Sequence, residues 1–293
     1  MVNYFSLING EFKNSISVLD RGLSYGDGIF ETMSWCHLSE NNLLGVEFWN
    51  RHIERIKNSC LITKIKFPSV NLLNNYKKKI LQRSYNEGFK TGILKIIITR
   101  GVGGRGYKFE RDIKPTIIFL SFPKADTAKS LYNKGVNVRF CRSPIFKNFQ
   151  LAGLKHLNRL DSVMSRSEWT SEDFFEGVLI DDKKNIVEGT MTNIFFSKDK
   201  VLFTPEIKDF GIKGIMRQIV IEKSILQFEK VVEKNIKKSD VDNFDEMFLT
   251  NSLLKIIPVK KLEKKFFRIS ECTKNLIKYF DDNKQKLRNL ELL

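Results

Sequence analysis

The chain has 293 residues with a formal net charge of +16, from 50 basic and 34 acidic side chains. Hydrophobic residues make up 42%, which is enough to bury a core and excludes a wholly disordered chain. Glycine and proline are too few for a fibrous protein. No run of about 18 apolar residues occurs, so no membrane-spanning helix is expected. The length predicts two domains.

Cysteine usage and charge narrow the class of protein further. The four cysteines are scattered without a Cys-x-x-Cys pair, and there are only three histidines, so neither a metal site nor a disulfide framework is expected. The N-terminus lacks a basic segment followed by an apolar stretch, which argues against a secretory signal. A reducing cytoplasm is the expected location. The lysines are spread along the chain, which favours solvated surfaces over a nucleic-acid interface, so neither nucleic acid nor a membrane is an expected partner.

The sequence pattern of residues 1–122 predicts several strands and two helices. Asn9-Gly10 is a strong hairpin signal between short strands at 4–8 and 11–12. Further strands are predicted at 28–35, 91–99 and 115–122, and helices at 47–60 and 70–87, with a glycine-rich loop at 100–107. The turn residues Pro123–Asp126 predict a boundary between a small N-terminal domain, 1–122, and a larger C-terminal domain, 123–293.

The second part also mixes both kinds of element. Strands are predicted at 136–140, 177–181, 191–197, 200–204 and 246–250, and helices at 158–169, 214–228 and 269–283. This mixture in both halves indicates an α/β or α+β fold.

Two charged residues stand in apolar surroundings. Lys155 lies among small and apolar residues in the stretch 151–160, where burial would lower the pKa of its ammonium group and make it a nucleophile. On this evidence alone, a surface lysine is the commoner outcome. Glu188 opens the apolar stretch 188–196, where a buried carboxylate would need a partner such as a protonated ring nitrogen. The alternative is an edge-strand glutamate that faces water.

Three segments could bind a phosphate. Glycines precede a predicted helix in 211–217, and the free N–H groups at a helix start bind anions. Thr250–Ser252 offers hydroxyls and amides after a strand, and Arg55 could donate two hydrogen bonds. Each segment is equally compatible with an ordinary helix start, a turn or a surface arginine. The loop 100–107 matches neither a dinucleotide fingerprint nor a P-loop.

Taken together and in this order, these motifs resemble the class IV pyridoxal-phosphate enzymes, which include branched-chain and D-amino-acid aminotransferases and aminodeoxychorismate lyase. The matching stretches are 19–31, 52–55, Lys155, 188–195, 214–217, 250–252 and 257–259. The resemblance implies a two-domain α/β (α+β) fold of type IV, like that of D-amino-acid aminotransferase. It also implies a homodimer with pyridoxal 5'-phosphate at the domain interface of each chain.

The resemblance also implies roles for individual residues. Lys155 would bind the cofactor as a Schiff base, and Glu188 would pair with its pyridine nitrogen. The phosphate would be held by Arg55, Ser252 and the amides of Ile215 and Met216. The substrate would meet Arg105, Tyr107 and Phe30. Branched-chain enzymes place a tyrosine five residues after the lysine, where this chain has Leu160, so no partner for the ring oxygen is assigned.

Within the family, the stretches 151–160, 100–107 and 250–254 resemble aminodeoxychorismate lyase. This resemblance implies a lyase that eliminates pyruvate from 4-amino-4-deoxychorismate and yields 4-aminobenzoate for folate synthesis. The nearest alternative is a branched-chain or D-amino-acid aminotransferase of the same fold. More distant alternatives are a basic nucleic-acid-binding module and an inactive relative retained as a binding protein.

Overall fold

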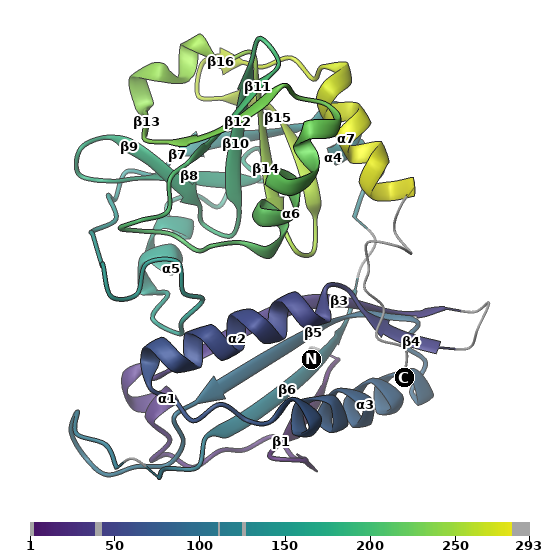
Figure 1. Cartoon of the computed structure of the whole chain (residues 1–293), viewed down its shortest axis with the longest axis vertical. Coiled ribbons are helices and arrows are strands. Elements are labelled where there is room, and N and C mark those ends of the chain that lie inside the picture. The colour runs from purple at the N-terminus through teal and green to yellow at the C-terminus, as the bar shows by residue number, and fades with distance from the viewer. Residues whose placement is uncertain (1–2, 39–42, 111, 125–126, 283–293) are drawn as a thin grey trace. The chain divides into compact units, whose positions relative to one another are not determined.

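The computed structural model describes residues 3–38, 43–110, 112–124 and 127–282 (Figure 1). Its internal packing separates two units. The first unit contains the described residues up to 124 together with Lys155–Asn158, and the second contains Thr127–Leu154 and the described residues from Arg159 to Asp282. A division into domains at residue 122 stays a prediction. No helix in the described ranges is both long enough and apolar enough to cross a membrane.

Six strands in the described part of the first unit form an antiparallel sheet with the order β2-β1-β6-β5-β3-β4. The strands are β1 (Phe5–Ile8), β2 (Glu11–Phe12), β3 (Gly28–Leu38), β4 (Leu43–Val46), β5 (Thr91–Thr99) and β6 (Thr116–Pro123). The predicted hairpin turn is confirmed, because Asn9 and Gly10 both have the positive φ angles, 52° and 87°, that such a turn requires.

Two long helices, α2 (Trp49–Thr63) and α3 (Val70–Asn86), pack against this sheet (Figure 1). Their apolar faces join side chains of β3 such as Met33 and Trp35 in one buried core. Both helices confirm the predictions made from the apolar periodicity of the sequence. The short helix α1 (Arg21–Tyr25) was not predicted, and it is capped by the Asp20 carboxylate, which accepts a hydrogen bond from the Gly22 N–H group at 2.8 Å.

The described part of the second unit contains a ten-stranded mixed sheet. Its strands are β7 (Val136–Phe140), β8 (Glu176–Ile180), β9 (Asn185–Gly189), β10 (Asn193–Lys198), β11 (Val201–Pro205), β12 (Lys230–Lys234), β13 (Ile236–Lys237), β14 (Glu246–Asn251), β15 (Lys255–Leu262) and β16 (Lys265–Phe266). Its α-helices are α4 (Lys129–Lys134), α5 (Leu160–Arg166), α6 (Ile215–Lys223) and α7 (Glu271–Asp282). Side chains such as Val138, Ile194 and Phe196 form a second buried core.

The helix predicted over 214–228 is shorter than expected. Helix α6 ends at Lys223 and is followed by a 3-10 turn over Ser224–Leu226. The Ser224 hydroxyl donates to the Ile221 carbonyl at 2.9 Å, a side-chain bond that competes with helix continuation. The two sheets with their helices confirm the predicted mixed fold.

Candidate active site

Lys155 is held against β3 by its backbone. The Phe30 N–H group donates to the Lys155 carbonyl at 2.9 Å, and the Leu157 N–H group donates to the Gly28 carbonyl at 2.9 Å. The Lys155 Nζ atom lies 4.2 Å from the centre of the Phe30 ring, and the side chain is half-buried. Backbone pairing and the aromatic contact together restrict where the amine points. A fully exposed surface lysine would have neither restraint.

A second lysine, Lys95 on β5, shares the same aromatic ring. Its Nζ atom lies 5.2 Å from the centre of the Phe30 ring, and burial lowers the pKa of Lys95. Burial favours the neutral form of the Lys95 amine, because a charged ammonium group loses its hydration there. Sequence analysis missed Lys95, although a lysine inside the otherwise apolar run 93–98 was a usable signal.

Arg55 is fixed by a buried carboxylate on β3. Its Nε and Nη2 atoms donate to Glu31 at 2.6 and 2.7 Å, and His52 Nδ1 lies 2.6 Å from the same group. Burial alone would raise the pKa of Glu31, but Arg55 and His52 outweigh it and lower this pKa to about 2. Arg55 is therefore an oriented, largely buried cation rather than a surface arginine. Its role toward a phosphate stays a prediction.

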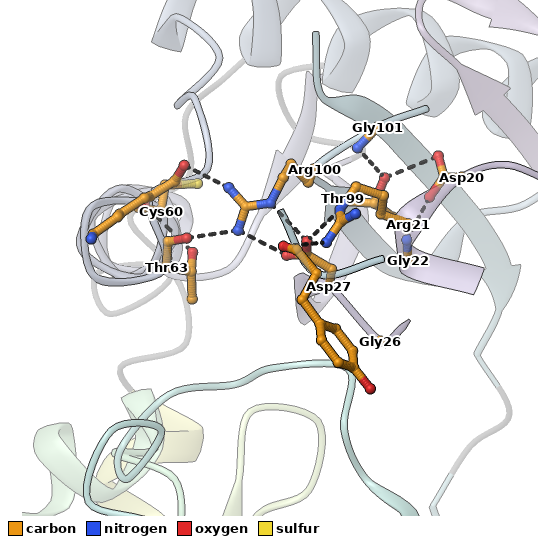
Figure 2. Close-up of polar contacts among 12 residues, drawn as sticks. Asp20, Arg21, Gly22, Gly26, Asp27, Cys60, Thr63, Thr99, Arg100 and Gly101 are labelled. Atoms are coloured by element: carbon orange, nitrogen blue, oxygen red, sulfur yellow. Dashed lines mark hydrogen bonds and ion pairs between the residues drawn. The ribbon is translucent and has the colours of Figure 1, made fainter. Parts of the chain in front are cut away.

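The charged residues of the 19–31 motif hold loops together (Figure 2). Arg100 Nε and Nη2 pair with the two oxygens of Asp27 at 2.7 and 2.9 Å, and Arg21 Nε donates to Asp27 at 2.9 Å. Arg100 also donates to the carbonyls of Thr63 and Lys64, at the C-terminal end of α2. The network thus joins the start of β3, the end of α2 and the start of the 100–107 loop.

Glu188 lies near the end of β9 and is only 6% exposed, so the water-facing alternative is wrong. Its Oε2 atom accepts hydrogen bonds from the Ile212 N–H group at 2.8 Å and from Asn193 Nδ2 at 3.3 Å. The sequence placed Glu188 at the start of a stretch that continues into a strand at 191–197. Instead the chain turns after Gly189, and β10 begins at Asn193.

This turn is held by a carboxylate that sequence analysis missed. Glu176 on β8 is fully buried and accepts hydrogen bonds from the N–H groups of Thr190 and Met191, each at 3.1 Å. The hydroxyl of Thr192 donates to it at 3.0 Å. Glu176 therefore fixes the turn that separates Glu188 from β10, which explains the error in the predicted strand.

Asn193 connects the elements around Glu188. Its Nδ2 atom also donates to the Ile212 carbonyl at 2.9 Å, and in the sheet it pairs with Thr250 of β14. A Cβ atom at Gly214 would overlap Asn193 Oδ1, so only glycine allows this approach. The N-terminus of α6 thus lies beside Glu188 and the strand end that leads to the 250–252 turn.

Three of the residues predicted to bind phosphate lie in this region. Ile215 and Met216 are the first two residues of α6, where unpaired N–H groups favour an anion. Ser252 lies in the turn between β14 and β15, and its carbonyl accepts a hydrogen bond from Lys255 Nζ at 2.6 Å. The structure therefore brings Glu188 and the start of α6 to the place where β9 ends and β10 begins, and Ser252 follows β14, the strand paired with β10.

The segment before Lys155 is bonded to the same region. The Gly153 N–H group donates to the Gly211 carbonyl at 2.8 Å, and the Lys213 N–H group donates to the Gly153 carbonyl at 3.2 Å. Ile212, which binds Glu188, lies between these two partners. Gly153, two residues before Lys155 in the sequence, is therefore bonded to the loop that holds Glu188.

The predicted substrate residues Arg105 and Tyr107 are both exposed on the 100–107 loop. Among the residues that the structure describes, no carboxylate forms an ion pair with Arg105. Phe30 is half-buried beneath the Lys155 amine. Contact of these residues with a substrate stays a prediction.

Comparison of the sequence with known families places the protein in one of them. The model of the amino-transferase class IV family matches residues 28–262, and the chain belongs to that family. The matched range includes Lys155, Glu188 and the start of α6, so the resemblance stated from the motifs is confirmed.

Individual relatives point to more than one activity. A Methanocaldococcus jannaschii protein, provisionally named a branched-chain-amino-acid aminotransferase, is 30% identical over 95% of this chain and 96% of its own length. The crystal structure of 4-amino-4-deoxychorismate lyase from Pseudomonas aeruginosa is 29% identical, with a TM-score of 0.85 over 95% of this chain and 98% of that one. The branched-chain amino acid aminotransferase from T.th., solved with pyridoxamine 5'-phosphate, has the same fold, with a TM-score of 0.86 at 18% identity over 99% of this chain and 97% of that one.

The cofactor of this family is pyridoxal 5'-phosphate, and the residues present fit it. Lys155 offers an oriented primary amine to an aldehyde, and Glu188 offers a buried carboxylate to a ring nitrogen. The start of α6 offers N–H groups to a phosphate. The protein is a pyridoxal-phosphate-dependent enzyme of class IV.

Proposed function

We propose that the protein is a 4-amino-4-deoxychorismate lyase that releases pyruvate and 4-aminobenzoate, a precursor of folate. The placement of Lys155, whose amine lies on the Phe30 ring two residues after the Gly153 anchor, carries the assignment of cofactor chemistry, which an aminotransferase of this family would share. Similarity to the Pseudomonas aeruginosa lyase along nearly the whole chain supports the lyase activity. So do the stretches 151–160 and 100–107, which resemble that branch of the family.

The residues divide into those that hold the cofactor and those that act on the substrate. We assign covalent attachment of the cofactor to Lys155 Nζ and stabilisation of its protonated ring nitrogen to Glu188. Phosphate binding is assigned to Arg55, Ser252 and the amides of Ile215 and Met216. When bound, the cofactor supplies a sink for the electron pair left by proton removal.

Lys155 also acts as the base. With its amine free, Lys155 Nζ would take the proton from the amine-bearing carbon of the substrate. The bond between the neighbouring ring carbon and the enolpyruvyl oxygen would then break with its electron pair on oxygen, the enolate would take up one proton to become pyruvate, and the ring would become aromatic. No second keto acid is consumed. The substrate carries two carboxylates, and the exposed Arg105 is suited to bind one of them.

The competing activity is transamination, which the Methanocaldococcus jannaschii relative favours. The decisive experiment offers the purified protein enzymatically made aminodeoxychorismate in one assay and amino acids with 2-oxoglutarate in another. Formation of 4-aminobenzoate supports the lyase. Product only from amino acids and 2-oxoglutarate would establish an aminotransferase instead.

Replacement of Lys155 by alanine tests the cofactor assignment. We expect Lys155→Ala to abolish turnover and to remove the visible absorption of the purified enzyme, because the amine assigned to the cofactor aldehyde is then lost. The measurements are an absorption spectrum and product formation. A Lys155→Ala protein that keeps both colour and activity would refute the assignment.

Replacement of Arg105 by alanine tests the substrate assignment. Since Arg105 is exposed and forms no ion pair with a described carboxylate, Arg105→Ala should raise KM for the substrate at least tenfold, a typical effect of losing a charged hydrogen bond (about 1.5–3 kcal/mol). The visible absorption should be unchanged. An equal loss of cofactor and substrate binding would instead indicate a structural role for this arginine.

A further inference from the structure

Side chains of α1 bind both backbone polar groups of Gly106, the residue between Arg105 and Tyr107. The Gly106 N–H group donates to the Tyr25 hydroxyl oxygen at 2.8 Å. Arg21 Nη1 donates to the Gly106 carbonyl, also at 2.8 Å. The tip of the 100–107 loop is therefore fixed from both sides.

These anchors are themselves rigidly held. Arg21 is 3% exposed, donates to Asp27 and places its guanidinium carbon 4.7 Å from the centre of the Tyr25 ring. The Tyr25 ring packs edge-on against the Tyr107 ring, with 5.6 Å between ring centres. Gly106 has a φ of +91°, a conformation that favours glycine. Tyr25 thus contacts the loop through both its hydroxyl and its ring.

A binding group on a fixed backbone loses less conformational entropy when its ligand arrives than the same group on a mobile loop. We propose that Tyr25 is a positioning residue which, through Gly106, holds Arg105 and Tyr107 ready for a carboxylate of the substrate. This inference rests on the substrate role proposed for the 100–107 loop. It adds to that role a single hydroxyl that can be removed without changing any charge.

The test is Tyr25→Phe in the cofactor-loaded full-length enzyme. Loss of one neutral hydrogen bond to the loop should raise KM for the substrate about two- to tenfold. Turnover number should stay within about twofold, since the role assigned to Tyr25 is to hold the loop, and the visible absorption should be unchanged. The matched control is Tyr4→Phe, the same chemical change at a half-exposed ring stacked on Phe122, for which KM should not move.

A double variant separates positioning from a general loss of structure. If Tyr25 acts through Arg105 and Tyr107, Tyr25→Phe should raise KM by a smaller factor in the Arg105→Ala background than in wild type. Hydrogen exchange gives a second readout, because the Gly106 amide should exchange faster in Tyr25→Phe than in wild type. An unchanged KM for Tyr25→Phe, or effects of the two changes that simply multiply, would overturn the inference.

Failure of the inference can be told apart from failure of the proposed function. If wild-type enzyme converts amino acids but not aminodeoxychorismate, the lyase proposal fails, and the KM comparison is made with the amino acid, which also carries a carboxylate. If wild type makes 4-aminobenzoate and Tyr25→Phe behaves like wild type, only the positioning role is refuted. A wild-type protein inactive with both substrates would refute both.

Discussion

Glu31 accepts three hydrogen bonds from Arg55 and His52 while its own side chain is almost inaccessible to water. Removing one partner of such a pair leaves a buried charge without compensation, which costs more than the pair itself contributes. The carboxylate thereby turns a flexible arginine into a fixed donor. Glu31 was not singled out as a site residue, although it follows Phe30 in a quoted motif.

Glu31→Gln is therefore expected to lower the free energy of unfolding at neutral pH by about 3–5 kcal/mol. Because the folded state depresses the Glu31 pKa from 4.5 to about 2, its contribution is fully present above pH 4.5 and is lost as the pH falls toward 2. Urea titrations of wild type and Glu31→Gln should show that their difference in free energy of unfolding shrinks as the pH falls from 4.5 toward 2. A difference in free energy of unfolding that does not change with pH would contradict the ion pair. Glu11→Gln, at an exposed carboxylate, serves as the control.

At the scale of elements, the start of α6 depends on a close approach. Gly214 has an ordinary φ of −63°, so its need for glycine comes from Asn193 and not from backbone strain. Asn193 in turn bonds Glu188 and Ile212. A change at Gly214 therefore reaches the Glu188 carboxylate through one side chain.

Gly214→Ala should destabilise the protein by about 1–3 kcal/mol, the usual cost of overpacking, because the new methyl group must displace Asn193. We also expect weaker retention of the cofactor during dialysis, measured by visible absorption. Gly104→Ala is the matched control, since a methyl group there meets no atom within 4 Å. Equal behaviour of the two variants would argue against the Asn193 contact.

Sequence periodicity predicted the long elements well and the short ones poorly. Helices α2 and α3 and strand β5 carry enough apolar repeats to be recognised, whereas α1 and β4 have five and four residues. The turn after Glu188 was missed because Glu176, which holds it, lies in another strand. Lys155 and Glu188 were found through motif order, and Lys95 could have been found as a lysine in an apolar run, but the contacts of Asn193 and Glu31 become evident only once strands are paired.

At the scale of the whole molecule, each unit has its own buried core and its own buried thiols. Cys60 belongs to the core of the first unit, and Cys141 packs in a smaller cluster of the second. Burial raises the pKa of each thiol to about 12, further helped at Cys141 by Glu168 and Glu176. Neither thiol is therefore available as the reactive thiolate near neutral pH.

Cys60 and Cys141 should resist a thiol reagent at pH 8 in the native enzyme and react once denaturant unfolds the unit that contains them. Mass spectrometry of labelled peptides would follow each unit separately. Rapid native-state labelling of either cysteine would contradict the packing described for that core.

Leu154 is the sole residue between two anchored positions, Gly153 on the 211–213 loop and Lys155 on β3. One extra amino acid inserted there would advance the lysine by a peptide, about 3.8 Å along the chain, unless one anchor broke. The number of residues between Gly153 and Lys155 is thus fixed by the two backbone anchors. Homologues are expected to keep this interval constant.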